Sequence, residues 1–162
     1  MDILWTPWRF SYVSEGVKRE GCFFCEKIAA DREHDPETLI LYRGKRNFVV
    51  LNLFPYTTGH AMIAPYAHEP RLAGLDAETL GEMMELGQKL ENALEQAYHP
   101  DGFNMGMNLG RSAGAGVAGH VHLHFLPRWT GDSSFMTVIG ETRVQPEDLA
   151  TTYRKLAAFF KA

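Results

Sequence analysis

The sequence predicts an α+β fold, with an antiparallel sheet of about five strands, one long central helix and a C-terminal helix. Several short segments alternate apolar and polar side chains, which is the period of a half-buried strand. Residues 76–98 instead repeat apolar side chains at helical spacing, and the C-terminal segment does the same. With 162 residues and no internal repeat, the chain is expected to form a single domain, 1–162, with an aromatic N-terminal arm at 1–20.

The predicted strands are short and are separated by turn residues. The turn Gly44-Lys45 joins the first two, and a loop that ends at Gly59 joins the second to the third. A fourth strand leads into a glycine-rich loop, and the last strand follows that loop. The expected strands span 39–43, 47–53, 60–66, 102–109 and 120–125.

Two helices carry recognisable start and stop signals. Asp76 suits the N-cap of the helix at 76–98, Leu75 and Leu80 suit a hydrophobic staple around that cap, and Pro100 stops the helix. A second helix is expected over 146–161, with Pro146 at its first position and acidic residues in its first turn.

The last predicted strand carries a histidine at every second position: His120, His122 and His124. Side chains on a strand point alternately to opposite faces, so the imidazoles share one face and Val121, Leu123 and Phe125 line the other. A lone histidine there is usually a core residue. A shared metal ion is a second reading, but alternate residues lie about 6.7 Å apart, so three rings hardly converge on one ion. In the third reading one imidazole attacks phosphorus, since neutral imidazole is a good nucleophile near pH 7 when its neighbours orient it.

The loop at 110–119 contains four glycines and precedes the histidines directly. Backbone N–H groups of such a loop can form an anion-binding nest, although a flexible turn is the simpler reading of glycines alone. No Walker A lysine follows, and a strand follows in place of the helix that a dinucleotide fingerprint requires. Beside the histidine strand, the loop indicates a phosphate cradle.

The string HVHLHFL at 120–126 resembles the signature of the histidine triad (HIT) nucleotide-binding superfamily. The longer string AGAGVAGHVHLHFLPRWTGDSSFM is similar to the branch with the diadenosine tetraphosphate phosphorylases and the bacterial relatives of the fragile-histidine-triad hydrolases. The resemblance implies a HIT-like sheet and a homodimer with an extended sheet. It also implies an enzyme that transfers nucleotidyl groups on dinucleoside polyphosphates or other adenosine nucleotides.

The expected chemistry places His122 as the nucleophile at the α-phosphorus, giving a transient nucleotidyl-histidine. His124 is expected to bond phosphate oxygens and help proton transfer, and His120 to hold the tautomer of His122, directly or from a zinc ion. The resemblance assigns Asn108 to a phosphate contact near the leaving group. His60 is assigned a structural role.

Nucleotide-binding residues are expected on two segments. The resemblance places Asn52 at the ribose hydroxyls, with Leu53 and Phe54 over the base, although plain strand-end packing explains the two apolar residues nearly as well. On the glycine-rich loop, Gly114 and Gly116 belong to the phosphate cradle. Two side chains at the loop tip are candidates for distal phosphates or for simple solvation: Arg111 and Ser112.

The two cysteines of the chain, Cys22 and Cys25, form a C-x2-C motif. A disulfide is disfavoured inside a cell, and a thioredoxin-type pair lacks its βαβ context. A reduced pair in a core turn and a mixed Cys2His2 zinc site both stay open. The resemblance implies structural zinc, with His68 and His120 as the other two ligands, and no organic cofactor.

Composition excludes several other function classes. The net charge of −4 gives no basic surface for nucleic acid or for an anionic membrane. No apolar run approaches the roughly 18 residues of a membrane span, and the N-terminal residues lack a secretory signal, so the cytoplasm is expected.

The second step hands the nucleotidyl group from His122 to water or to inorganic phosphate. Two positions before the triad bear on which of these is the acceptor. Among the proteins that this sequence resembles, the fragile-histidine-triad hydrolases carry a Gln four residues before the first histidine. The small phosphoramidase members carry a Ser three residues before it. Here Gly116 and Val117 stand there, and the bare glycine leaves room for an acceptor oxyanion. Phosphorolysis of diadenosine tetraphosphate to ATP and ADP is therefore preferred. Hydrolysis of dinucleoside polyphosphates or nucleoside phosphoramidates, or nucleotide binding without turnover, are the alternatives.

Overall fold

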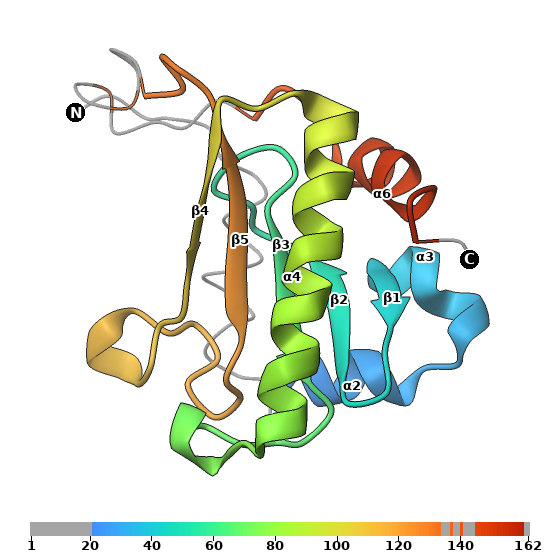
Figure 1. The fold of residues 1–162 in the computed structure, drawn as a ribbon, viewed down its shortest axis with the longest axis vertical. Helices are drawn as coiled ribbons and strands as arrows, with labels where there is room; N and C mark the ends of the chain where they lie inside the picture. Colours follow the sequence, from blue (N-terminus) through green and yellow to red (C-terminus); the bar gives the residue numbers. More distant parts are fainter. Residues whose placement is uncertain (1–20, 134–136, 138–139, 141–144, 161–162) are drawn as a thin grey trace.

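The computed structural model describes residues 21–133, 137, 140 and 145–160. Its centre is a five-stranded antiparallel sheet in the order β1-β2-β3-β5-β4 (Figure 1). Four strands are shorter than predicted, because pairing ends where the chain turns, and the fifth starts and ends three residues later than predicted. They span β1 Ile40–Arg43, β2 Asn47–Leu51, β3 Ala61–Pro65, β4 Gly102–Gly106 and β5 Leu123–Arg128.

The long helix α4, Ala77–Tyr98, lies across one face of this sheet, and α6, Leu149–Ala157, packs beside it (Figure 1). Asp76 caps α4 as predicted, since its side chain accepts from the Thr79 backbone N–H at 2.7 Å. The predicted start of the C-terminal helix at Pro146 is wrong, because Asp148 is the N-cap and accepts from the Thr151 N–H at 2.9 Å. None of the described helices is long and apolar enough to span a membrane.

Two short helices precede the sheet, and the sequence analysis did not foresee them: α2, Phe23–Ala29, and α3, Asp35–Thr38. They connect to β1 through Arg43, which contacts Asp35 and donates to the Ile28 and Ala30 carbonyls at 3.1 and 2.9 Å. This guanidinium satisfies carbonyls at the end of α2, as basic groups commonly do at helix C-termini. The predicted aromatic arm, 1–20, lies outside the described residues.

Apolar side chains form a separate cluster on each face of the sheet. Alternate residues of β2 and β3 point to opposite faces, so Val49 and Ile63 join α4 while Phe48 and Met62 join the other cluster. The second cluster includes Phe24 of α2 and, at its margin, Val117 of the glycine-rich loop. The candidate site lies on this second face.

A carboxylate fixes the β1–β2 turn to α4. Glu82 accepts hydrogen bonds from the backbone N–H groups of Lys45, Arg46 and Asn47, each at 2.7 Å, and from the Asn47 amide at 2.9 Å. Burial alone raises the pKa of Glu82, but these donors outweigh it and hold the pKa below its usual value. The clamp aligns the sheet under the helix.

Candidate functional site

Of the three triad histidines, His124 lies on β5 and the other two lie just before it; all are buried, with exposed fractions of 0% for His120, 5% for His122 and 8% for His124. Leu123 and Phe125 pack in the α4 cluster, so the predicted apolar face is confirmed at these two positions, whereas Val121 is buried before the strand and belongs to neither apolar cluster. The strand itself begins at Leu123, three residues later than predicted. His120 therefore stands before the ladder, where its ring is held by side chains from other segments.

His122 is held in one tautomer by the backbone. Its Nδ1 lies 2.8 Å from the His120 carbonyl oxygen, so Nδ1 carries the proton and Nε2 keeps its lone pair. Burial lowers the pKa of His122, and the hydrogen bond to His120 offsets only part of that effect. The ring is therefore neutral at pH 7, with an unprotonated Nε2.

His124 receives a hydrogen bond from a fourth histidine, His60, to which the sequence analysis assigned only a structural role. The Tyr56 backbone N–H donates to His60 Nδ1 at 3.1 Å, which leaves the proton of His60 on Nε2. That nitrogen lies 2.9 Å from His124 Nδ1. His124 Nδ1 is then the acceptor, and its Nε2 carries a proton that can be donated. Burial, reinforced by His122, lowers the pKa of His124 to about 4.

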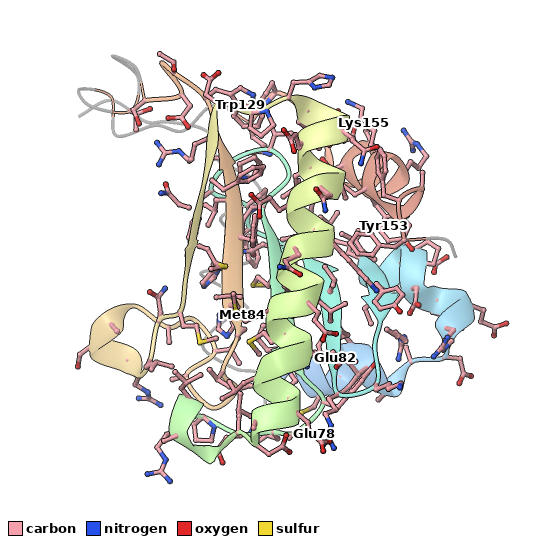
Figure 2. The ribbon with its side chains drawn as sticks, viewed as in Figure 1. Glu78, Glu82, Met84, Trp129, Tyr153 and Lys155 are labelled. Carbon is pink, nitrogen blue, oxygen red and sulfur yellow. The ribbon has the colours of Figure 1, made fainter. Side chains whose placement is uncertain are left out.

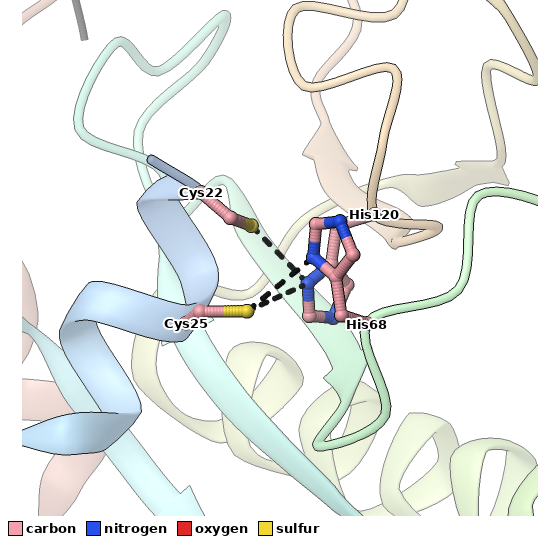
Figure 3. Close-up of side chains that lie close together, drawn as sticks. All are labelled: Cys22, Cys25, His68 and His120. Carbon is pink, nitrogen blue, oxygen red and sulfur yellow. Dashed lines mark hydrogen bonds between the residues drawn. The ribbon is translucent and has the colours of Figure 1, made fainter. Parts of the chain in front are cut away.

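The cysteine pair meets His68 and the first triad histidine, His120 (Figure 3). His120 Nδ1 lies 3.3 Å from Cys22 Sγ and 3.7 Å from Cys25 Sγ, and His68 Nδ1 lies 3.4 Å from Cys25 Sγ. The four ligand atoms all lie within 4.8 Å of one another. A tetrahedral Cys2His2 zinc site has ligand–ligand distances of roughly 3.3–3.8 Å, so the donor set fits a zinc ion with little movement.

The protons of this cluster also suit a cation. His120 Nε2 lies 2.8 Å from the Pro65 carbonyl oxygen and donates to it, so Nδ1 presents its lone pair to the thiols. A backbone acceptor behind a ligating imidazole is the usual second-layer support of a zinc site. Burial and the neighbouring Cys22 thiol raise the pKa of Cys25, so this thiol stays protonated at pH 7 unless a cation displaces its proton.

The glycine-rich loop bends where glycine permits it. Gly110 and Gly114 have φ of 84° and 86°, in the left-handed region, and enclose the short turn that carries Arg111 and Ser112. Both side chains are exposed, and no described contact joins them to the triad. Gly116 is exposed as well, and Asn108 is half-buried at the start of the loop. Trp129 lies at the opposite end of β5 from this loop (Figure 2).

The segment predicted to hold ribose and base borders the fourth histidine. The side-chain oxygen Oδ1 of Asn52 accepts from the Phe54 backbone N–H at 2.9 Å, and the side-chain nitrogen Nδ2 of Asn52 lies 3.3 Å from His60 Nδ1. Leu53 is 36% exposed and Phe54 is half-buried, so both remain accessible beside the triad face. His60 could have been suspected from the sequence only by its place at the start of a strand that pairs with the triad strand.

Comparisons with known proteins agree with this geometry. The HIT domain model matches residues 33–131. The chain is 41% identical over 159 residues to the AP-4-A phosphorylase of Mycobacterium tuberculosis, covering 95% of this chain and 82% of that protein. It is 30% identical over 115 residues to an asymmetrical bis(5'-nucleosyl)-tetraphosphatase of Schizosaccharomyces pombe, covering 70% and 63% of the two chains.

Solved structures of histidine triad proteins resemble this fold. A zinc-bound histidine triad family protein from Mycobacterium smegmatis superimposes with a TM-score of 0.68 at 30% identity, covering 86% of this chain and 93% of that chain. The fold, the row of buried imidazoles and the sequence matches lead to one conclusion: the chain belongs to the histidine triad family.

Proposed function

We propose that the protein cleaves diadenosine tetraphosphate by phosphorolysis, releasing ATP and ADP through a nucleotidyl-histidine intermediate. The similarity to an AP-4-A phosphorylase over 95% of the chain supports the substrate class. The observation that carries the mechanism is the orientation of two rings. His122 presents an unprotonated Nε2 with a free lone pair, and His124, 4.7 Å away between ring centroids, presents a protonated Nε2.

In the first step, His122 Nε2 attacks the α-phosphorus in line and forms a P–N bond while the bond to the bridging oxygen breaks. ATP leaves with that oxygen, and an adenylyl group stays on His122. The Nε2–H of His124 donates to the phosphate oxygens on which charge develops. In the second step, an oxygen of inorganic phosphate attacks the same phosphorus, the P–N bond breaks and ADP leaves. Histidine is regenerated, and atoms and charges balance.

The remaining binding roles follow the two accessible segments. Asn52 is proposed to contact the ribose, with Leu53 and Phe54 against the base. Asn108 and the backbone N–H groups near Gly114 and Gly116 are proposed to bind the reacting phosphates. Two exposed side chains at the loop tip are proposed to reach the distal phosphates: Arg111 and Ser112.

The four-residue cluster is proposed to hold a structural zinc ion, bound by Cys22, Cys25, His68 and His120. When bound, zinc would supply cross-linking and would not act on the substrate. The residues themselves hold α2 and the segment around His68 against the start of the triad strand. Cysteine ligation requires reduced thiols, which supports the cytoplasm as the proposed compartment.

A homodimer is proposed through the open edge of the sheet. β4 ends the strand order, and its residues Asn104, Met105 and Gly106 are exposed. Met105 is 50% exposed, and so is Met84 on α4. Edge strands with apolar side chains pair readily with another chain, and a second copy of this strand can do so antiparallel.

Product analysis tests the proposed reaction. Diadenosine tetraphosphate is incubated with the protein, with and without inorganic phosphate, and the nucleotides are separated. Phosphorolysis gives equal ATP and ADP only when phosphate is present. AMP and ATP in equal amounts, unaffected by phosphate, would mean that water is the acceptor, as the match to a tetraphosphatase would suggest. The His122→Ala variant is expected to lose turnover in either case, and full turnover by that variant would reject the covalent mechanism.

A further inference from the structure

Phe24 stands between the two cysteines of the C-x2-C motif in the sequence, and its side chain is buried, with 1% of its surface exposed. Its ring centroid lies 4.8 Å from that of His122 and 5.1 Å from that of His120, tilted by 44° and 52°. No other described phenylalanine has a ring contact with either histidine. The aromatic ring therefore packs against both the proposed nucleophile and the first triad residue.

Contacts on more than one side leave the His122 ring little freedom. The His120 carbonyl binds Nδ1, the His124 ring packs at 4.7 Å and 70°, and Phe24 packs at 4.8 Å. This hydrogen bond selects the tautomer, but it is a single bond, and if it breaks the whole imidazole can swing about its first side-chain torsion and lose its tautomer preference. A packed ring restricts that swing, because cores at native density leave no void into which an imidazole can turn.

The helix that carries Phe24 is held at both ends. At its start, the Cys22 and Cys25 sulfurs lie within 3.7 Å of His120 Nδ1. At its end, Arg43 donates to the carbonyls of Ile28 and Ala30. A helix fixed in this way can keep one side chain in place against a neighbouring strand.

We propose that Phe24 is a positioning residue for the nucleophile: it holds the His122 imidazole in the orientation that aims Nε2 at phosphorus, and so connects the cysteine-bearing helix to catalysis. This inference rests on the proposed function, because it takes His122 as the attacking group. Phe24 has no polar group that could bind phosphate or transfer a proton, so it would act through the His122 ring. Its loss should therefore lower the rate of the chemical step while the nucleotide still binds.

The test replaces Phe24 by Leu, which keeps an apolar side chain but loses the flat ring. Phe48→Leu is the matched control, because Phe48 is fully buried in the same cluster and contacts Phe24 and Tyr66 but no histidine. Each variant is purified, and its zinc content and Tm are measured. Steady-state kcat and KM for diadenosine tetraphosphate are then determined, and imidazole tautomers are followed by long-range proton–nitrogen NMR.

Phe24→Leu is expected to lower kcat at least about tenfold with KM changed less than about twofold, since a misplacement of about 1 Å can cost about 100-fold in rate. The His122 signals should change from one tautomer to a mixture. Phe48→Leu should lower Tm at least as much and keep kcat. Equal kcat losses in both variants would assign the effect to general destabilisation and overturn the inference.

Two further outcomes would also overturn it. A raised KM with unchanged kcat would make Phe24 a nucleotide contact, and a kcat loss explained by loss of zinc would make it a support of the metal cluster. The His122→Ala variant keeps this test separate from that of the proposed function. If His122→Ala is inactive and Phe24→Leu is normal, only the positioning role fails. If His122→Ala is fully active, the proposed function fails.

Discussion

Acidification is expected to destabilise the protein through His124. This imidazole is 8% exposed, and the rings of His60, His122 and Tyr56 face it. Its Nδ1 accepts from His60, so a proton added there would break that hydrogen bond and bury a charge. Burial and His122 together lower the pKa of His124 from 6.5 to about 4.

The sign follows from proton linkage. Between pH 6.5 and about 4 the unfolded chain binds a proton at His124 and the folded chain does not, so the free energy of unfolding falls as the pH falls. A tenfold difference in proton affinity is worth about 1.4 kcal/mol. Relative to pH 7, His124 alone is therefore expected to remove about 2 kcal/mol by pH 5 and about 3 kcal/mol by pH 4. This is a large share of a typical domain's stability.

Urea unfolding at a series of pH values measures this loss. The control is His124→Gln, in which the amide oxygen can still accept from His60 but no proton binds near neutral pH. Both proteins are studied at equal zinc content, so that acid effects on the cysteine cluster act on both. The wild type should lose about 2 kcal/mol more than the variant between pH 7 and pH 5. Parallel pH profiles for the two proteins would refute the argument that burial keeps His124 neutral.

Three other perturbations test different parts of the structure. His60→Ala should lower kcat at least about tenfold, because the tautomer of His124 is no longer fixed. His60→Gln should restore part of the lost kcat, because its side-chain amide can donate to His124 Nδ1. Equal rates for the two variants would contradict a role for the His60–His124 hydrogen bond. Glu82→Ala should lower the free energy of unfolding by about 2–3 kcal/mol in urea titrations, because the N–H groups of the β1–β2 turn lose a charged acceptor. The control Glu78→Ala, on the same helix surface (Figure 2), should lower it by less than about 1 kcal/mol. Similar losses in the two variants would show that the hydrogen bonds of Glu82 to the turn add no particular stability. Exhaustive chelation should remove about one zinc ion per chain by metal analysis and lower Tm, and Cys25→Ser should lower Tm and zinc content similarly; an unchanged Tm after metal removal would argue against a structural ion.

Local periodicity in the sequence was enough for much of this fold. The alternation through Phe125 predicted which face of the last strand is apolar, because the side-chain period of a strand is fixed. The helical repeat and Asp76 likewise predicted α4 and its cap, since both depend on neighbouring residues. Strand ends were less well predicted, because they depend on where a partner strand stops.

The contacts that make the site came from the tertiary structure. His60 and His124 are 64 residues apart, and they meet because β3 pairs with β5 in the register that places Met62 opposite His124. Phe24 reaches the triad because α2 folds over the second face of the sheet, and no periodic signal revealed that helix. Local side-chain patterns determine which element forms, whereas strand register and packing between distant segments decide which side chains touch. The row of histidines was therefore readable from the sequence, but the residues that set their tautomers and hold their rings were not.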